Sequence, residues 1–518
     1  MKVKIAILES NGVVLESVRK NFNNLLSEFF TCEFVEFSEQ NTLIKYVREH
    51  SVDIIISDLS LGDKNDYNGL NLVRSIKENY PEILIIGNSG GEPTYRQTSD
   101  KYPTFDIYVD KAKLFNNVDK NYEQHIKDLI KTKFNKNTSV KIKEDSKILE
   151  NEKFENREDR NLVSIIQQCT YTGISNKEDK TYINYVTLQP LTGGRSKSDV
   201  YKMEASLSDL RMECLPAVLK ISEHQKAKEE LQNYDKFVKW LLPYTWRVDI
   251  LGTGFTKQWG AVCYSFILSN QEKFDSLTYY IEDKNDKIID FVYNQIFAID
   301  KQKWYQIIRT EESISKRYFE RYFHREGSNT ETRNFENYIQ EFFHNAVYSR
   351  NGVTVNDKKY PLPHESLFAD AEKNNQKYAV CIIHGDLNGN NVIVSENEQI
   401  LFIDFQDTGF GHVFEDFIAF ECSIRLHYPI ELDKSKSIEY LNLELNIEND
   451  FEAPFDSKYK EHIHNIRKLA FANFPRENPK NYYYGLAAYA FRLLRLDLRD
   501  EQKMKITACL LASLKNMN

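Results

Sequence analysis

Residues 381–405 read CIIHGDLNGNNVIVSENEQILFIDF, and this stretch decides the fold of the C-terminal half of the chain. Around it lie three apolar runs that we predict to be strands: Tyr378–Ile383, Val392–Val394 and Ile400–Phe405. Polar residues stand where these strands end, namely Asp386, Asn391 and Asp404. Phosphoryl transfer needs a carboxylate near the attacking hydroxyl and oxygen ligands for Mg²⁺. The stretch therefore predicts a phosphoryl-transfer site, with Asp386 near the acceptor and with Asn391 and Asp404 as metal ligands.

The spacing H-G-D-x-x-x-x-N followed by I-D-F resembles the catalytic loop and the metal-binding Asp of protein-kinase-like folds. Gly385 stands where protein kinases have Arg, and Gln406 stands where they have Gly. These departures make the stretch similar to the aminoglycoside phosphotransferase and choline kinase family. The resemblance implies a bilobal fold that binds ATP and Mg²⁺ between its lobes. The alternative is a surface turn with solvated polar residues, but three elements in the expected order favour the catalytic interpretation.

Composition sets the outer limits. The 518 residues are enough for about three domains, each with its own core. The 68 basic and 77 acidic residues give a net charge of −9, so nucleic acid is not an expected partner. Seven cysteines without a C-x-x-C pair favour a reducing cytoplasm over disulfides or a zinc site. The sequence shows neither a signal peptide nor a stretch that could span a bilayer, so no membrane is expected.

Residues 1–132 alternate short apolar runs with amphipathic segments. Strands are predicted at Ile5–Leu8, Cys32–Phe37, Ile54–Ser57, Ile83–Ile86 and Ile107–Val109. Helices are predicted at Val13–Leu26, Asn41–Glu49 and Leu70–Glu78. Strands that alternate with helices predict a parallel sheet covered on both faces, as in the doubly wound flavodoxin-like fold. Ligands of such sheets bind at the carboxyl ends of the strands, where this sequence places Glu9, Ser10, Asp58, Asn88, Ser89 and Lys111.

This segment resembles the receiver domain of bacterial response regulators. The resemblance implies that Asp58 accepts a phosphoryl group and that Lys111 pairs with the phosphate. It also implies that Asn88 or Ser89 occupies the switch position and that Glu9 helps to hold a metal ion. A histidine kinase or another protein is then the expected partner of this domain.

The segment departs from the receiver pattern at two positions. Receivers usually carry two adjacent acids after the first strand, whereas here Glu9 is followed by the neutral Ser10. Ala112 follows Lys111 where Pro is usual. One carboxylate fewer weakens a site for a hard cation. A domain that only docks a partner or forms a homodimer is therefore an equal alternative to a phosphorylated one.

Residues 133–161 are charged and poor in apolar residues, which predicts a linker without a core of its own. Residues 162–270 are predicted to form the N-terminal lobe of the kinase-like fold. Its antiparallel strands are expected at Val186–Leu191, Val200–Met203 and Ala217–Ile221, with a later strand at Ala261–Leu268.

The loop Thr192–Asp199 joins two of these strands and contains a Gly-Gly pair. Glycine lets backbone N–H groups approach phosphates closely, although a Gly-Gly turn alone is more often an ordinary hairpin. A following strand carries Val-Leu-Lys, the order found in the kinase N-lobe, so Lys220 is predicted to contact the α- and β-phosphates. The residues predicted to bind the nucleotide are Thr192, Gly193, Gly194, Ser196, Ser198 and Lys220.

The segment Glu223–Leu242 is predicted to be an amphipathic helix. Glu229 or Glu230 could pair with Lys220, and we favour Glu230 because Tyr234, four residues on, shares its side of the helix. For the other glutamate the expectation is a solvated helix charge.

Residues 271–518 are predicted to form the helical C-terminal lobe, beginning with a mostly helical insertion over Glu272–Tyr378. Its segment 313–327, SISKRYFERYFHREG, interleaves arginines and aromatics, a pattern that could contact phosphate or nucleic acid. We favour a core stripe of aromatics with Arg317 and Arg321 on the solvent face. Asp416 is predicted to support the catalytic loop and to cap a helix, and Tyr483–Leu496 is predicted to be a core helix.

The sequence thus predicts a multidomain α/β and α+β protein, a receiver-like domain joined to a bilobal kinase-like fold. The expected activity is ATP- and Mg²⁺-dependent phosphoryl transfer to a hydroxyl or amine, with Asp386, Lys220 and Glu230 as catalytic residues. Regulation by the receiver-like domain is expected. The alternatives are a catalytically silent nucleotide-binding scaffold and nucleotidyl transfer to protein. The acceptor, whether a small molecule or a protein, is not predicted.

Overall fold

The computed structural model describes residues 2–27, 30–50, 52–58, 75–76, 83–89, 106–115, 120–136, 141–142, 165–166, 168–170, 183–191, 199–207, 216–256, 258–265, 274–298, 303–323, 329–349, 352–368, 376–449 and 455–517. The chain divides into two compact units. The first comprises Met1–Lys228 and Asp249–Phe266, and the second comprises Glu229–Val248 and Ile267–Asn518. Within the described residues, no helix has the length and apolar character needed to cross a membrane.

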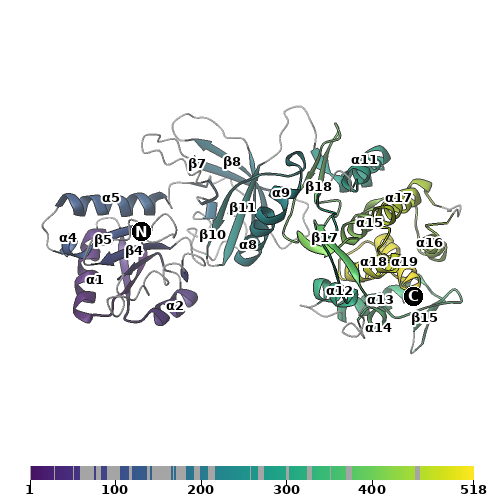
Figure 1. Ribbon diagram of the computed structural model, residues 1–518, viewed down its shortest axis with the longest axis horizontal. Helices are drawn as coiled ribbons and strands as arrows, with labels where there is room; N and C mark the ends of the chain where they lie inside the picture. The colour runs from purple at the N-terminus through teal and green to yellow at the C-terminus, as the bar shows by residue number, and fades with distance from the viewer. Residues whose placement is uncertain are drawn as a thin grey trace. The chain divides into compact units, whose positions relative to one another are not determined.

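The first unit begins with a parallel sheet in the strand order β2-β1-β3-β4-β5. Strands β4 and β5 of this sheet are labelled in Figure 1. Its strands are β1 (Lys2–Leu8), β2 (Thr31–Phe37), β3 (Ile54–Ser57), β4 (Leu84–Ser89) and β5 (Ile107–Asp110). The described helices are α1 (Gly12–Leu26), α2 (Gln40–Glu49), α4 (Lys111–Phe115) and α5 (Lys120–Lys136). This strand order is that of flavodoxin-like folds, so the predicted fold class is confirmed. The helix predicted at Leu70–Glu78 lies mostly outside the described residues.

The side chains of the receiver-like sheet alternate between two apolar layers. Ile5 of β1 belongs to the buried cluster that contains Phe22 of α1. The next residue, Ala6, belongs to the cluster on the opposite face, which contains Leu43 of α2. Because successive strand residues point to opposite faces, a sheet covered on both faces needs continuous apolar strands. In β3 and β4, accordingly, the polar residues stand at the carboxyl ends, as Ser57 and Asn88 do.

A second sheet in the first unit has the strand order β10-β11-β9-β8-β7-β6. Its strands are β6 (Lys141–Ile142), β7 (Ile183–Pro190), β8 (Asp199–Leu207), β9 (Ala217–Glu223), β10 (Ile250–Phe255) and β11 (Trp259–Ser265). Strands β7, β8 and β9 are antiparallel neighbours, as predicted. The sequence did not predict β10, nor the short β6, which lies within the predicted linker and pairs in parallel with β7.

The helix predicted over Glu223–Leu242 is divided into three parts. These are α8 (His224–Asn233), a π-helical turn (Tyr234–Val238) and α9 (Lys239–Leu241). The π-helical turn packs against the segment that follows Asp404, because the rings of Tyr234 and Phe405 lie 5.7 Å apart. Asn233 also donates a hydrogen bond of 2.7 Å to the carbonyl of Gln406. The part of this helical segment that carries Glu230 is thereby attached to the second unit.

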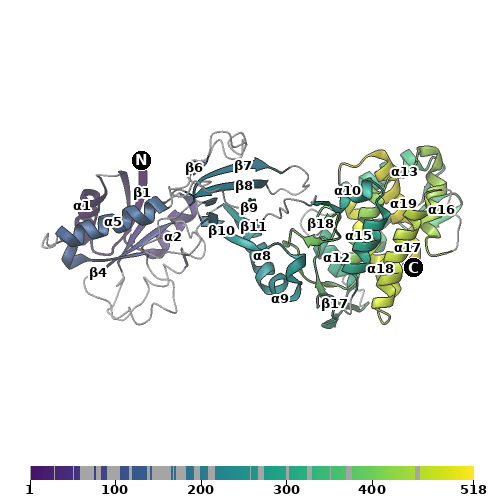
Figure 2. The same ribbon diagram turned by 90° about the horizontal axis from the view of Figure 1, so that it is seen from above.

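The second unit contains small sheets and most of the described helices (Figure 2). Its strands are β12 (Phe274–Ser276), β13 (Arg309–Glu311), β14 (Val347–Ser349), β15 (Gly352–Val355), β16 (Lys358–Tyr360), β17 (Tyr378–Ile383), β18 (Val392–Ser395), β19 (Ile400–Phe402) and β20 (Gly409–His412). Its helices are α10 (Leu277–Glu282), α11 (Asp286–Ile296), α12 (Ile314–Tyr322), α13 (Asn329–Phe342), α14 (Pro363–Phe368), α15 (Glu415–His427), α16 (Ser437–Leu445), α17 (Ser457–Asn473), α18 (Pro479–Leu493) and α19 (Asp500–Asn516).

The three strands predicted around the deciding stretch are confirmed as β17, β18 and β19, although β19 ends at Phe402, before Asp404. The prediction for Glu272–Tyr378 needs a correction. The segment contains the predicted helices, but also β12, β13 and the separate sheet β14-β15-β16. These strands have three or four residues each, which is too short for alternation to be recognised in the sequence.

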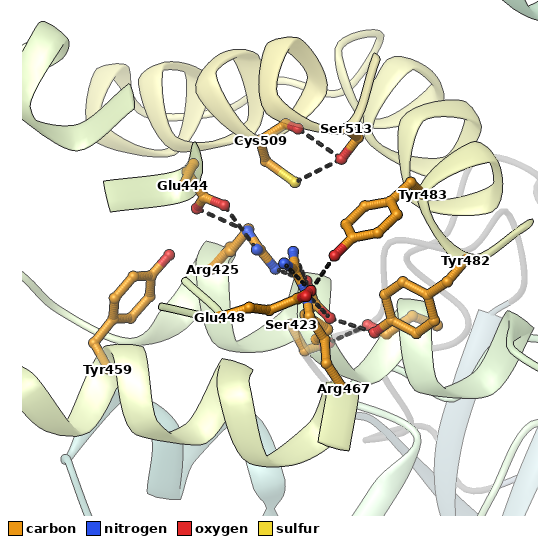
Figure 3. Close-up of polar contacts among 12 residues, drawn as sticks. Ser423, Arg425, Glu444, Glu448, Tyr459, Arg467, Tyr482, Tyr483, Cys509 and Ser513 are labelled. Carbon is orange, nitrogen blue, oxygen red and sulfur yellow. Dashed lines mark hydrogen bonds and ion pairs between the residues drawn. The ribbon is translucent and has the colours of Figure 1, made fainter. Parts of the chain in front are cut away.

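Helix α15 is the central helix of the C-terminal bundle and is buried along nearly its whole length. It carries Glu421 and Arg425, both of which are fully buried. Arg425 donates hydrogen bonds of 3.0 and 2.8 Å to Glu444 of α16 (Figure 3). It donates another, of 2.6 Å, to Glu421. Arg467 of α17 also binds Glu421, at 2.8 Å. Charges buried in this way need partners, and these partners join α15 to α16 and α17.

Candidate active site

Residues 384–391, the predicted catalytic loop, are anchored by the buried carboxylate of Asp416. Its two oxygens accept hydrogen bonds from the backbone N–H groups of His384, at 2.8 Å, and Gly385, at 2.9 Å. The hydroxyl of Tyr305 donates a third, at 3.0 Å. The predicted support of the loop by Asp416 is therefore present. The predicted cap is wrong, because α15 begins at Glu415 with Phe414 at its N-cap position, and the Asp416 side chain is turned toward the loop.

Gly385 has a backbone conformation that favours glycine. Its φ is +86°, and a Cβ atom built on it would lie 2.2 Å from the carbonyl oxygen of Asp407. A side chain would therefore be strained at this position and would collide with backbone. The glycine lets the loop pass close to the chain that follows Asp404, which explains why the motif reads H-G-D.

His384 joins the catalytic loop to the strand that precedes Asp404. Its Nε2 lies 3.0 Å from the carbonyl oxygen of Ile403, and the N–H of Asp386 lies 3.4 Å from its Nδ1. A carbonyl only accepts and a backbone N–H only donates, which assigns the proton to Nε2. Burial lowers the pKa of His384. The ring is therefore neutral and serves as a spacer between the two segments rather than as a base.

Asp386 and Asn391 are in direct contact. The side-chain nitrogen of Asn391 donates hydrogen bonds of 2.8 Å to the Asp386 carbonyl and 3.0 Å to its Oδ2. Asn388 donates another hydrogen bond of 3.0 Å to the same Oδ2. Both partners of the Asn391 nitrogen are acceptors, so the amide orientation is fixed. The Asn391 Oδ1 is then the atom left to coordinate a cation.

Asn391 and Asp404 lie at the same open end of the β18–β19 hairpin. Val392 and Phe402 are cross-strand partners, and the N–H of Ile403 donates to the carbonyl of Asn391 at 3.1 Å. Asp404 follows directly, with a φ of +64° that is uncommon for a residue with a side chain. The structure thus brings together the three residues that the sequence singled out. Backbone strain of this kind gathers at functional sites.

The carboxyl group of Asp386 is a candidate general base. It is half-buried, and burial raises its pKa. Arg492 lowers this pKa, whereas Asp404 and Asp407 raise it, so burial and the neighbouring carboxylates prevail. A raised pKa brings a carboxylate closer to the range in which it can take a proton at neutral pH.

Helix α12 has the predicted buried aromatic stripe, but the prediction that its arginines face solvent is wrong. Arg317 donates hydrogen bonds of 2.9 and 3.2 Å to the buried Glu415. Arg321 lies 3.0 Å from the same carboxylate and donates a hydrogen bond of 2.5 Å to the Gly385 carbonyl. The arginines share a face that is covered by α15 and the catalytic loop. Helical spacing alone cannot tell such a face from a solvated one.

Of the residues predicted to bind the nucleotide, the structure describes Lys220. Residues 192–198, which include Thr192, Gly193, Gly194, Ser196 and Ser198, lie outside the described part of the chain. Lys220 is 6% exposed on β9, between Val200 of β8 and Val262 of β11. Glu230 is 1% exposed, whereas Glu229 is half-buried, which fits the preference for Glu230. Lys220 and Glu230 belong to different units, and their pairing stays a prediction.

In the receiver-like domain, one ammonium group holds two carboxylates. The Lys111 Nζ lies 2.6 Å from Glu9 Oε2 and 2.7 Å from Asp58 Oδ2. Asn88 is buried, and its Oδ1 has no hydrogen-bond partner within the described structure. The side chain of Ser89 lies outside the described residues. The structure therefore brings together Glu9, Asp58 and Lys111, and the role of Asp58 as phosphoryl acceptor stays a prediction.

Residues 325–434 match the model of the phosphotransferase enzyme family. This segment contains the catalytic loop, Asn391, Asp404 and Asp416. Comparison with the curated proteins gives no match.

Solved receiver domains are similar to the N-terminal part of the chain. The isolated receiver domain of RcsB from Salmonella enterica serovar Typhimurium is 24% identical, covering 22% of this chain and 79% of that one, with a TM-score of 0.18. A signal receiver domain from Pseudomonas fluorescens Pf-5 is 18% identical, covering 26% and 96%, with a TM-score of 0.20. A response regulator from Thermotoga maritima is 15% identical, covering 25% and 98%, with a TM-score of 0.20. The receiver-like architecture of this chain rests on its own strand order.

Glu415 and its two arginines are the part of the site that the sequence analysis missed. One signal in the sequence was the acidic pair Glu415-Asp416, which stands at the start of a helix after Asp404, the predicted metal ligand. The other signal was the i, i+4 spacing of Arg317 and Arg321. Neither signal shows that the arginine face of α12 packs against Glu415 of α15.

We expect Glu415→Gln to destabilise the second unit in a pH-dependent way. Burial by itself would raise the pKa of Glu415, but Arg317 and Arg321 outweigh burial and lower this pKa from 4.5 to about 2. A lowered folded-state pKa stabilises the fold above pH ~4.5, and this contribution is lost as the pH falls toward ~2. The shift corresponds to about 3 kcal/mol at neutral pH. Thermal unfolding of wild type and variant between pH 7 and pH 3.5 would measure it.

The exposed Glu439→Gln is the matched control and should leave the unfolding temperature nearly unchanged. A difference between wild type and Glu415→Gln that stays constant down to pH 3.5 would contradict the assigned ion pairs.

Proposed function

We propose that this protein is an ATP- and Mg²⁺-dependent phosphotransferase acting on a hydroxyl or amine acceptor. The observation that carries the proposal is the arrangement of Asp386, Asn391 and Asp404 on one loop and one hairpin end. The match of residues 325–434 to the phosphotransferase family supports the same class of reaction. Phosphoryl transfer depends on positioning and charge stabilisation, and these residues would supply both.

The residues present fit a magnesium ion. Mg²⁺ prefers oxygen ligands and is commonly held by one or two protein oxygens together with phosphate oxygens and water. Asp404 offers a carboxylate, and the fixed amide of Asn391 offers its Oδ1. Among the described residues, no group of three or more His, Cys, Asp or Glu side chains could hold a metal by itself. Phosphate oxygens of a bound nucleotide, together with water, would supply the remaining ligands.

Lys220 and the loop Thr192–Asp199 are proposed to bind the nucleotide phosphates. Lys220 is buried in the middle of the second sheet, and its cross-strand partner on β8 is Val200, the residue that follows the loop. Glu230, also buried, is proposed as the carboxylate that orients it. Bound Mg²⁺ would neutralise charge on the phosphates, and the ammonium group would hold them in position.

Asp386 is proposed to orient the acceptor and take its proton. Asn388 and Asn391 both donate to Oδ2, which fixes the carboxylate plane. The acceptor O–H or N–H would give its proton to this carboxylate as the new bond to phosphorus forms and the bond to ADP breaks. Neutral His384 maintains the loop geometry through Ile403 and takes no proton in this scheme.

Asp386→Asn should reduce phosphoryl transfer by at least ~100-fold, because proton transfer by a positioned side chain contributes about that much. ATP affinity should stay nearly unchanged, because Asp386 faces the acceptor. Transfer from labelled ATP to small molecules, to protein and to the chain itself is the measurement, together with calorimetric titration of ATP and Mg²⁺. The exposed Asp283→Asn is the matched control. Wild-type turnover in Asp386→Asn would exclude Asp386 as the base.

The receiver-like domain is proposed to regulate the transferase, with a histidine kinase or another protein as its partner. The ion pairs of Lys111 with Glu9 and Asp58 hold the two carboxylates of this pocket through one ammonium group. Phosphorylation of Asp58, or a partner bound nearby, would change this charge balance and could select another state. A silent nucleotide-binding scaffold remains the second candidate, because the nucleotide loop lies outside the described residues. The unpaired cysteines among the described residues support a cytoplasmic location.

If the domains are coupled, Asp58→Ala should change ATP affinity or turnover of the full chain by about 5-fold or more, the lower end of typical allosteric coupling. The exposed Asp128→Ala on α5 is the control for the loss of a carboxylate. Both quantities can be measured in the assays described above. Equal ATP affinity and turnover for wild type and Asp58→Ala, with and without a phosphodonor such as acetyl phosphate, would show that this domain does not regulate the transferase.

A further inference from the structure

Arg492 is a half-buried cation in the last turn of α18. Its guanidinium carbon lies 5.0 Å from the ring centre of Tyr322 and 5.5 Å from that of Tyr489. These two rings contact each other edge to face, with their centres 5.6 Å apart. Arg492 is therefore held against aromatic faces, an arrangement in which a guanidinium keeps its hydrogen-bonding edge available.

Arg492 differs from the other arginines of this core. Arg317 and Arg321 pair with Glu415, and Arg425 and Arg467 pair with Glu421. Within the described residues, Arg492 forms no hydrogen bond or ion pair with a carboxylate, and its contacts are the two tyrosine rings. A half-buried guanidinium that forms no direct hydrogen bond to a carboxylate keeps donors available for an external anion.

The proposed base is close enough to interact with this cation. Burial raises the pKa of Asp386, and Arg492 is the strongest influence that lowers it. Burial lowers the pKa of Arg492, but Tyr489, Tyr322 and Asp386 together raise it. Of these three groups, Asp386 is the one carboxylate, and it is also the residue proposed to face the acceptor. Arg492 is thus near the carboxylate that is proposed to face the acceptor.

The contacts of Tyr322 place Arg492 beside the loop that carries Asp386. Tyr322 follows Arg321 in α12, and Arg321 donates a hydrogen bond of 2.5 Å to the Gly385 carbonyl. The guanidinium of Arg492 lies over the Tyr322 ring. Arg492 is therefore near this part of the loop.

We propose that Arg492 binds an anionic group, a carboxylate or a phosphate, on the acceptor whose hydroxyl faces Asp386. The proposal rests on the proposed phosphotransferase function and adds the chemical class of its substrate. A guanidinium already oriented by two rings can bind a carboxylate or phosphate through two parallel hydrogen bonds. The competing explanation is that Arg492 only joins α12 to α18 or only adjusts the charge of Asp386.

Ligand binding to the full chain would test the proposal. The chain would be saturated with Mg²⁺ and a non-hydrolysable ATP analogue, so that anions do not occupy the nucleotide site. Small hydroxyl compounds of similar size and different charge would then be titrated: 3-hydroxypropionate, glycerol 3-phosphate, 1,3-propanediol and 3-amino-1-propanol. We expect at least one anion to bind about tenfold more tightly than the neutral and cationic compounds, as for a charged hydrogen bond. The two anions distinguish a carboxylate from a phosphate.

Arg492→Gln should abolish this preference, and Arg492→Lys, which keeps the charge but loses the planar fork, should retain part of it. The exposed Arg476→Gln removes the same charge elsewhere and should keep the full preference. Equal binding of all four compounds by wild type would overturn the proposal, as would an unchanged preference in Arg492→Gln. If Arg492→Gln fails to fold, the comparison of wild type with Arg492→Lys still decides the outcome.

The readout separates this proposal from the proposed function. Binding of the ATP analogue is recorded first, and its absence would count against the phosphotransferase. The charge preference is then measured by binding of the hydroxyl compounds, without turnover. A chain that binds and hydrolyses ATP but shows no anion preference would retain the proposed function and lose only the assigned substrate class.

Discussion

The geometry of the candidate site depends on the hydrogen bonds from the His384 and Gly385 backbone to the carboxylate of Asp416. These N–H groups lie in a tight, buried turn in which Gly385 has a φ of +86°, so no regular ladder can satisfy them. Each buried donor left without a partner would cost about 1–3 kcal/mol. With both satisfied, β17 ends at Ile383 and the chain turns so that Asp386 meets Asn391.

Asp416 can hold the loop in this position because α15 is itself held by contacts with several neighbouring elements. Glu415 beside it binds Arg317 and Arg321 of α12, and Ser423 two turns later accepts the N–H of Gly389 at 2.9 Å. Glu421 and Arg425 on the same helix join it to α16 and α17. Buried ion pairs add little net stability, since desolvation offsets their attraction. We infer that they set the position of α15, and through it the position of the catalytic loop.

Much of the fold and of the candidate site could be predicted from the sequence, and the wrong predictions have physical causes. The receiver-like sheet and β17–β19 were predictable because their apolar runs are long or bounded by strong turn residues. Asp386, Asn391 and Asp404 were predictable because each lies close to an end of a strand that the sequence already indicated. The direction in which Arg317 and Arg321 face was not, since an amphipathic pattern does not reveal a buried carboxylate on another helix. The π-helical turn at Tyr234–Val238 depends on packing against Phe405 and Phe410, far away in the sequence.

The most direct test is a crystal structure of the full chain with Mn²⁺ in place of Mg²⁺ and a non-hydrolysable ATP analogue. Anomalous scattering locates Mn²⁺ without ambiguity. If the site is a phosphotransferase centre, the metal will be bound by the carboxylate of Asp404 and the Oδ1 of Asn391, with the remaining ligands from phosphate and water. Asp386 will face the terminal phosphate without touching the metal. A metal and nucleotide bound away from Asn391 and Asp404, or no binding at all, would contradict this arrangement.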